Sequence, residues 1–151
     1  MTGPACEFCR IVRGERPARI VGESPEALAF FPLRPVVLGH TLVIPKEHVR
    51  DLWSPGAPSR SLMQEVRQVW QALIAALRPD GLNLISSAGE AASQTVFHLH
   101  LHVIPRWSGD HLGNIWPPSE PLSEDLKGET AAAVRAAYNA IRAECGNNDH
   151  S

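Results

Sequence analysis

Short apolar runs dominate the first hundred residues of the chain and predict strands. Two of them, 19–23 and 27–31, are separated by Ser24 and Pro25, a pattern typical of a hairpin. Three further strands are predicted over residues 41–44, 81–87 and 97–105. Apolar and polar residues alternate most regularly in the last of these, as expected for a strand with two different faces.

Two longer segments place apolar residues at helical spacing. The first, 61–77, opens with Ser61 and Gln64, which could form a capping box, and Pro79 is expected to end it. The second spans residues 123–145. Its apolar seam consists of Leu126, Val134, Tyr138 and Ile141.

The order of these elements predicts the class of fold. Strands precede and surround one helix without regular β-α-β alternation, which favours an antiparallel sheet with segregated helices. We therefore expect an α+β fold with a five-stranded antiparallel sheet. A chain of 151 residues suits one domain with a hydrophobic core, so we expect a single domain over 1–151.

Composition narrows the classes of function. Apolar residues make up 44% of the chain and charged residues 20%, values that exclude a wholly disordered protein. The net charge of −2 does not indicate a nucleic-acid or membrane partner. The sequence shows neither a run of apolar residues that would span a bilayer nor a signal peptide, so we expect a cytoplasmic protein.

Three histidines stand at alternate positions, with His98, His100 and His102 separated by Leu99 and Leu101. On a strand the three imidazoles would share one face, about 6.6 Å apart. Two neighbours could chelate a metal ion, but a row of three also suits an extended anion such as a polyphosphate. One neutral imidazole can attack phosphorus while protonated neighbours hold the oxygens.

Two cysteines form the spacing Cys6-x-x-Cys9 near the amino terminus. In a reducing compartment such a pair indicates a metal or redox site rather than a structural disulfide. Thioredoxin-like redox chemistry is disfavoured because the pair does not follow a strand of a β-α-β unit.

Four stretches together resemble the histidine triad family. Residues 98–104 match its His-φ-His-φ-His-φ-φ signature, where φ is apolar. Residues 35–48 resemble the family's Pro-Gly-His-x-Leu-φ-φ-Pro-Lys-x-His segment, residues 94–96 precede the triad as in many members, and residues 6–9 resemble the cysteine pair of zinc-containing members. The resemblance covers roughly residues 6–106, in the expected order.

The resemblance implies a nucleotide hydrolase or nucleotidyl transferase that acts on a phosphoanhydride or phosphoramidate bond. His100 would attack the α-phosphorus of a nucleotide or nucleotide conjugate and form a nucleotidyl-histidine intermediate. The substrate or the catalytic cluster would be held by His102, Gln94, Thr95, Ser87 and His40. The resemblance also implies a homodimer whose sheets join across the interface.

The zinc-containing members imply a structural metal site in this chain. Its ligands would be Cys6, Cys9, His48 and His98, and the metal would pin an amino-terminal segment, 1–15, to the sheet. A site closed by four protein ligands is structural rather than catalytic.

Two positions depart from the family's pattern. Pro32 stands where relatives carry Asp or Asn to bind the ribose hydroxyls, and Ser87 stands where they carry Asn or Gln near the scissile phosphate. Two other functions stay open, and the two departures support the second of them. One is a metal-dependent hydrolase that uses the histidine row, although no carboxylate lies in residues 97–106. The other is a nucleotide-binding module with weak turnover.

Overall fold

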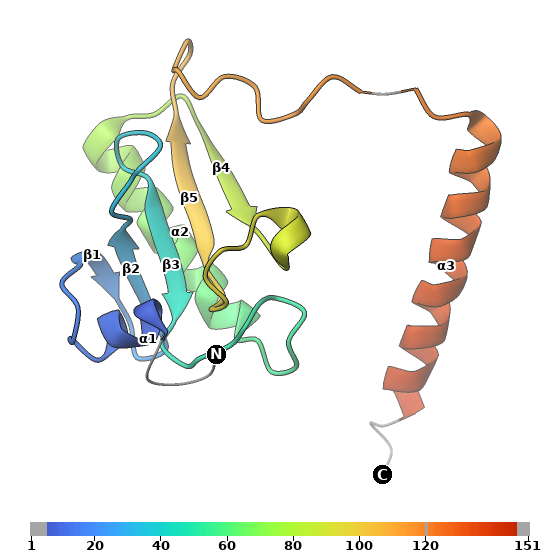
Figure 1. Cartoon of the computed structure of the whole chain (residues 1–151), viewed down its shortest axis with the longest axis horizontal. Coiled ribbons are helices and arrows are strands. Elements are labelled where there is room, and N and C mark those ends of the chain that lie inside the picture. The colour runs from blue at the N-terminus through green and yellow to red at the C-terminus, as the bar shows by residue number, and fades with distance from the viewer. Residues whose placement is uncertain (1–5, 120, 148–151) are drawn as a thin grey trace. The chain divides into compact units, whose positions relative to one another are not determined.

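The computed structural model describes residues 6–119 and 121–147 and contains a five-stranded antiparallel sheet. The strands are β1 (Arg19–Glu23), β2 (Ala27–Phe31), β3 (Thr41–Pro45), β4 (Gly81–Ser86) and β5 (Leu101–Arg106). They lie in the order β1-β2-β3-β5-β4, and each pairs antiparallel with its neighbours (Figure 1). The predicted α+β fold is confirmed.

The β1–β2 hairpin turns at Ser24 and Pro25, as predicted. The Ser24 hydroxyl accepts a hydrogen bond of 3.1 Å from the Ala27 N–H, and the Ser24 N–H donates to the Ala27 carbonyl at 3.0 Å. A serine side chain thus closes the turn that the sequence pattern indicates.

Helix α2 (Ser59–Leu77) begins two residues before the predicted 61–77. Pro58 occupies the position before the helix, where a fixed φ and a missing N–H cost little. The Ser61 hydroxyl donates to the Pro58 carbonyl at 3.3 Å. The predicted capping box of Ser61 with Gln64 is wrong, because the helix already starts upstream of both residues.

Two short helical elements were not expected from the sequence. Helix α1 (Glu7–Val12) has six residues, and the 3₁₀ helix η1 (Glu90–Ala92) has three. Neither is long enough to display a repeating apolar face, which is the signal that sequence patterns provide.

The two faces of the sheet are covered by different helices (Figure 1). On one face α2 packs over strands β2, β3 and β5. This cluster contains Ala27, Ala29, Val43, Leu62, Val66, Val69, Leu73, Leu99, Leu101 and Val103. On the other face α1 packs over β2 and β3. That cluster contains Cys6, Phe8, Cys9, Leu28, Phe30, Leu42 and Ile44.

The chain divides into two compact units, residues 1–113 and 114–151. In the second unit, α3 (Glu124–Asn147) covers the predicted helix, and the Ser123 hydroxyl accepts a hydrogen bond of 3.2 Å from the Leu126 N–H. The predicted apolar seam of α3 is exposed. No helix in the described part of the chain combines the length and apolar content needed to cross a bilayer. A single domain over the whole chain stays a prediction.

Candidate active site and metal centre

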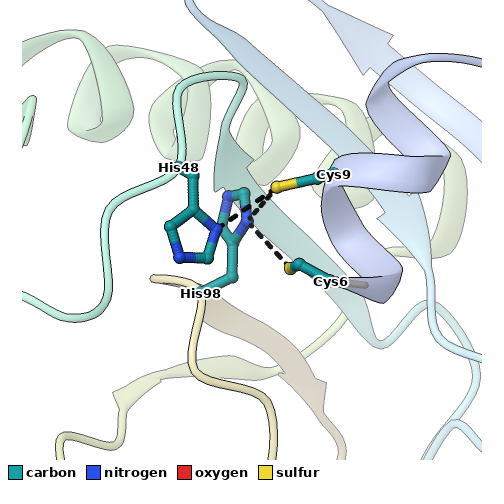
Figure 2. A group of neighbouring side chains, drawn as sticks. All are labelled: Cys6, Cys9, His48 and His98. Carbon is teal, nitrogen blue, oxygen red and sulfur yellow. Dashed lines mark hydrogen bonds between the residues drawn. The ribbon is translucent and has the colours of Figure 1, made fainter. Parts of the chain in front are cut away.

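Cys6, Cys9, His48 and His98 converge on one point from distant parts of the chain (Figure 2). Cys6 directly precedes α1 and Cys9 lies within it, so this short helix presents both thiols. The Sγ atoms of Cys6 and Cys9 are each 3.5 Å from His98 Nδ1, and Cys9 Sγ is 3.2 Å from His48 Nδ1. The four potential ligand atoms lie within 4.8 Å of one another.

This geometry fits a tetrahedral zinc ion. Ordinary Zn–S and Zn–N bonds place sulfur and nitrogen ligands roughly 3.5 Å apart, close to the observed separations. His98 Nε2 donates to the Pro45 carbonyl at 2.8 Å, which leaves the lone pair of a neutral ring on Nδ1, facing the thiols. Burial, together with the neighbouring Cys6 sulfur, raises the pKa of the Cys9 thiol to about 11. A bound cation would reverse that preference and favour the thiolate. The first five residues of the predicted segment, 1–15, lie outside the described residues.

The predicted strand over 97–105 is shorter in the structure, where β5 begins at Leu101. Of the three histidines in the row, only His102 belongs to the strand. Leu99, between the other two, donates its N–H at 2.6 Å to the carbonyl of Val49, which lies outside the sheet. The residues before β5 therefore bond to the segment that follows β3, and they do not extend the strand pairing of the sheet.

The three rings of the row face different partners. His98 turns toward the thiols, whereas the ring centroids of His100 and His102 lie 5.0 Å apart. Phe8 of α1 packs edge-on against His98 at 5.8 Å and against His100 at 5.4 Å. The row is thus divided between a metal cluster and a second pair of imidazoles.

A backbone hydrogen bond determines the tautomer of His100. Its Nδ1 lies 2.7 Å from the carbonyl oxygen of His98, and a carbonyl can only accept. Nδ1 therefore carries the proton, and the lone pair of the neutral ring is on Nε2. The residue is only 7% exposed, so the surrounding protein restricts reorientation of the ring.

A second chain of hydrogen bonds orients His102. The Val36 N–H donates to His40 Nδ1 at 3.2 Å, so His40 carries its proton on Nε2. That nitrogen lies 2.8 Å from His102 Nδ1, which accepts, and a neutral His102 then carries its proton on Nε2. His111 Nε2 donates to the Val36 carbonyl at 2.7 Å, so the backbone N–H and C=O of Val36 are each bonded to a histidine ring.

Burial keeps these imidazoles neutral. It lowers the pKa of His98 to about 4, with further lowering by the neighbouring His48 and His100. It also lowers the pKa of His102 to about 4, helped by the charges that His100 and His40 would carry. The pKa values of His100 and His40 are lowered by burial as well. At neutral pH the cluster therefore consists of uncharged rings with defined tautomers. The protonated neighbours expected from the sequence are wrong, because burial disfavours the charged form of each ring.

Comparison with known proteins identifies a HIT domain over residues 13–109. The chain belongs to the HIT family. Protein hit of Bacillus subtilis is 38% identical over 113 residues, which are 74% of this chain and 78% of that protein. Adenylylsulfatase HINT3 of Arabidopsis thaliana is 36% identical over 108 residues, which are 71% of this chain and 55% of that enzyme.

Solved structures of the family share the fold. A protein from Streptococcus mutans UA159 superimposes with a TM-score of 0.81 at 37% identity, covering 91% of this chain and 89% of its own. A Zn-bound histidine triad family protein from Mycobacterium smegmatis superimposes with a TM-score of 0.63 at 36% identity, covering 93% of this chain and 97% of its own.

Three substrate-binding residues predicted for this HIT domain have different surroundings. Gln94 is 3% exposed, and its amide nitrogen donates to the carbonyls of Arg50 at 2.8 Å and Val96 at 3.2 Å. Its carbonyl oxygen accepts from the Gly89 N–H at 2.8 Å. Thr95 is exposed and Ser87 half-buried, and neither side chain makes a hydrogen bond to the residues that the structure describes. Substrate contact by all three stays a prediction.

Sequence reasoning missed several groups that shape the HIT site. Phe8 contacts two of the histidines, and its apolar side chain between the two cysteines is a signal that could have been used. The Pro45 carbonyl and the backbone of Val36 orient His98 and His40. Backbone groups leave no signal in the residue types, so only the fold reveals them.

Proposed function

We propose that the protein is a nucleotide hydrolase or nucleotidyl transferase in which His100 is the nucleophile. The observation that carries this proposal is the bond from His100 Nδ1 to the His98 carbonyl, which leaves a lone pair on Nε2 of a buried, neutral ring. An uncharged imidazole nitrogen in a fixed tautomer is ready to attack phosphorus without prior loss of a proton.

The reaction proceeds in two displacements. His100 Nε2 attacks the α-phosphorus of a nucleotide or nucleotide conjugate, the bond to the leaving group breaks, and the leaving group departs with its electron pair. Water then attacks the same phosphorus, and the P–N bond breaks with its electron pair returning to Nε2. The products are the nucleoside monophosphate, the free histidine and the proton that the water loses. In a transferase another acceptor replaces water. The protein contributes mainly position and charge stabilisation.

The neighbouring side chains have supporting roles in this proposal. His102, with its proton on Nε2, donates to a phosphate oxygen or to the leaving group. His40 acts through His102, because its hydrogen bond sets that tautomer. Thr95 and Ser87 offer hydroxyl donors to the phosphate. The three backbone bonds of Gln94 support a role in positioning the loop around Thr95.

We propose that Cys6, Cys9, His48 and His98 hold one structural zinc ion. When bound, zinc would supply a rigid link between α1 and the residues that flank β3 and β5. Four protein ligands leave no open coordination position for a reacting water. This donor set disfavours the alternative of a metal-dependent hydrolase, in which at least one position has to be open.

The test is a search for the covalent intermediate. Adenylyl sulfate is the first substrate to assay, since the plant relative is named for its hydrolysis; dinucleoside polyphosphates and nucleoside phosphoramidates complete the panel. Rapid quench followed by intact-mass spectrometry should show a nucleotidyl adduct, and peptide mapping should place it on His100.

Two variants decide the assignment. His100→Asn removes the nucleophile while its amide can still donate to the His98 carbonyl, so the variant should fold, retain zinc and lose turnover. His102→Asn should turn over more slowly but still form the adduct. An adduct on another residue, or full activity in His100→Asn, refutes the proposal. Ligand binding by the wild type without product release would favour the weak binding module.

We also propose that two copies associate through the face formed by β4 and α2. β4 is an edge strand, and unpaired edges invite pairing with another chain. Beside it lies an apolar hollow of about 560 Å³, and Leu84 and Met63 are 41% and 46% exposed. A twofold axis would place this self-complementary surface on both copies. The apolar lining residues are Met63, Val66, Trp70, Ile74, Leu82 and Leu84, and Arg67 and Gln71 complete the lining.

A further inference from the structure

A second, polar hollow of about 270 Å³ lies between α2 and the β1–β2 turn. It is on the sheet face that α2 covers, opposite the face where α1 carries the cysteine–histidine cluster. Nothing in the proposed nucleotide chemistry uses it. The polar side chains that line it are Ser24, Glu26, Ser61, Gln64, Glu65 and Gln68.

Glu65 is the unusual member of this set. The residue is only 3% exposed. Its carboxylate nevertheless forms no hydrogen bond or ion pair with the residues that the structure describes. In this part of the chain every fully enclosed side-chain nitrogen or oxygen has a partner. The carboxylate oxygens of Glu65 are therefore open to the hollow. A carboxylate at the wall of a hollow, with no partner among the described residues, can accept hydrogen bonds from a cationic ligand.

The backbone beneath Glu65 makes room for the carboxylate. The register of β1 shifts between Ile20 and Gly22, and a Cβ atom at Gly22 would lie 2.8 Å from Glu65 Oε1. The missing side chain at Gly22 is therefore what allows the carboxylate to lie against the strand.

The lining favours a cation. Two carboxylates, two hydroxyls and two amides face the hollow, and no basic side chain lines it. Lys46, whose backbone N–H donates to the Glu26 carbonyl, directs its ammonium group to Glu23 at 2.7 Å. The negative charge of Glu65 thus has no cation of the described chain beside it.

The size and ligand set favour an organic cation over a metal ion. Calcium needs six to eight oxygen ligands, whereas among the described residues only the cysteine–histidine group gathers three or more metal-binding side chains. The volume equals that of roughly nine water molecules at about 30 Å³ each. This space accommodates an ammonium group with a short alkyl chain.

We propose that this hollow binds a primary alkylammonium ion, with the Glu65 carboxylate accepting hydrogen bonds from the ammonium group. The hydroxyl and amide oxygens of the lining accept the remaining N–H groups. Glu26, on the exposed turn, provides a second negative charge at the rim, so a short diamine should bind more tightly than a monoamine of the same length.

The experiment is a titration of ¹⁵N-labelled full-length protein with 1,4-diaminobutane and with butylamine, at constant ionic strength set by NaCl. Saturable amide shifts are expected at residues 22–26 and 61–68, with the diamine binding more tightly. Separate titrations with MgCl₂ and CaCl₂ should give no saturable shift there. Absence of a saturable amine response, the same response to NaCl alone, or saturation by a divalent cation instead overturns the proposal.

Two variants probe the carboxylate in different ways. Glu65→Gln removes the charge, and Gly22→Ala retains it but displaces Oε1 with a methyl group. Each should weaken diamine binding at least about tenfold, the effect of losing a hydrogen bond to a charged group. Matched controls are Glu129→Gln, on α3, and Gly81→Ala, whose added Cβ meets Arg106 at an ordinary 3.9 Å. If Glu65→Gln does not fold, Gly22→Ala decides; unchanged affinity in a folded variant refutes the proposal.

Discussion

Gly39 is the position where one added methyl group should disturb both the fold and the candidate site. Its φ of +79° lies in the left-handed region, and a Cβ atom there would be 2.5 Å from Leu77 Cδ1 and 3.1 Å from Leu73 Cδ2. The left-handed conformation costs a non-glycine residue about 1–2 kcal/mol, and overpacking a core costs about 1–3 kcal/mol. Gly39→Ala should therefore lower the free energy of unfolding by about 2–5 kcal/mol.

A second glycine separates the two contributions. Gly56 has nearly the same φ, +78°, but a Cβ atom there has no atom of the described residues within 4 Å. Gly56→Ala should therefore cost only the backbone contribution of about 1–2 kcal/mol. Urea unfolding of both variants and the wild type at pH 7 measures the difference. Because Gly39 precedes His40, its substitution should also reduce turnover, whereas Gly56→Ala should not. Equal destabilisation by the two substitutions would refute the packing argument.

Four further predictions concern the metal, the ribose, pH and assembly. The double variant Cys6→Ser/Cys9→Ser should lose the bound zinc, about one ion per chain, and melt at a lower temperature while it keeps some turnover. Metal analysis that finds no zinc in wild-type protein purified from zinc-replete medium would contradict this. Since Pro32 has no side chain that bonds a ribose hydroxyl, kcat/KM for matched ribo and deoxyribo substrates should differ by less than roughly a hundredfold, about 2.7 kcal/mol, and Pro32→Asp should raise the ratio. Burial lowers the pKa of His102 to about 4 in the folded state, so between pH 6.5 and about 4 the unfolded chain binds more protons and the free energy of unfolding decreases as the pH decreases. Urea unfolding at pH 7 and pH 5 should show a smaller loss of stability for His102→Asn than for the wild type, and an equal loss would argue against the lowered pKa. Leu84→Lys should convert a dimer to a monomer in light scattering, and a monomeric wild type would exclude the proposed assembly.

Regular apolar patterns allowed much of the fold to be predicted from local sequence. The five strands, the β1–β2 hairpin at Ser24 and the long helices α2 and α3 all follow from side-chain period and turn chemistry. The start of β5 did not, because alternation continues through Leu99, whose N–H bonds to Val49. A period-two pattern describes which side chains face the core, and an irregular segment can satisfy it as well as a strand.

Family resemblance anticipated which residues the structure brings together at the cluster. The cysteine pair lies far from His48 and His98 in the chain, yet the resemblance to zinc-containing members was sufficient to group the four residues. The alternation of residues 98–102 placed His100 and His102 in one row with His98, but it contained no information on which nitrogen of each ring carries the proton.

Sequence by itself determined the kinds of chemical groups available and the faces on which they lie, because residue type and local period are written along the chain. Tertiary structure decided how those groups are oriented and which hydrogen-bond partners they have. His98 turns to the thiols because the Pro45 carbonyl accepts from its other nitrogen, and His100 keeps its lone pair on Nε2 because the His98 carbonyl accepts from Nδ1. These partners are backbone atoms shared by every residue type, and only the packing of distant segments determines which of them comes within hydrogen-bonding distance.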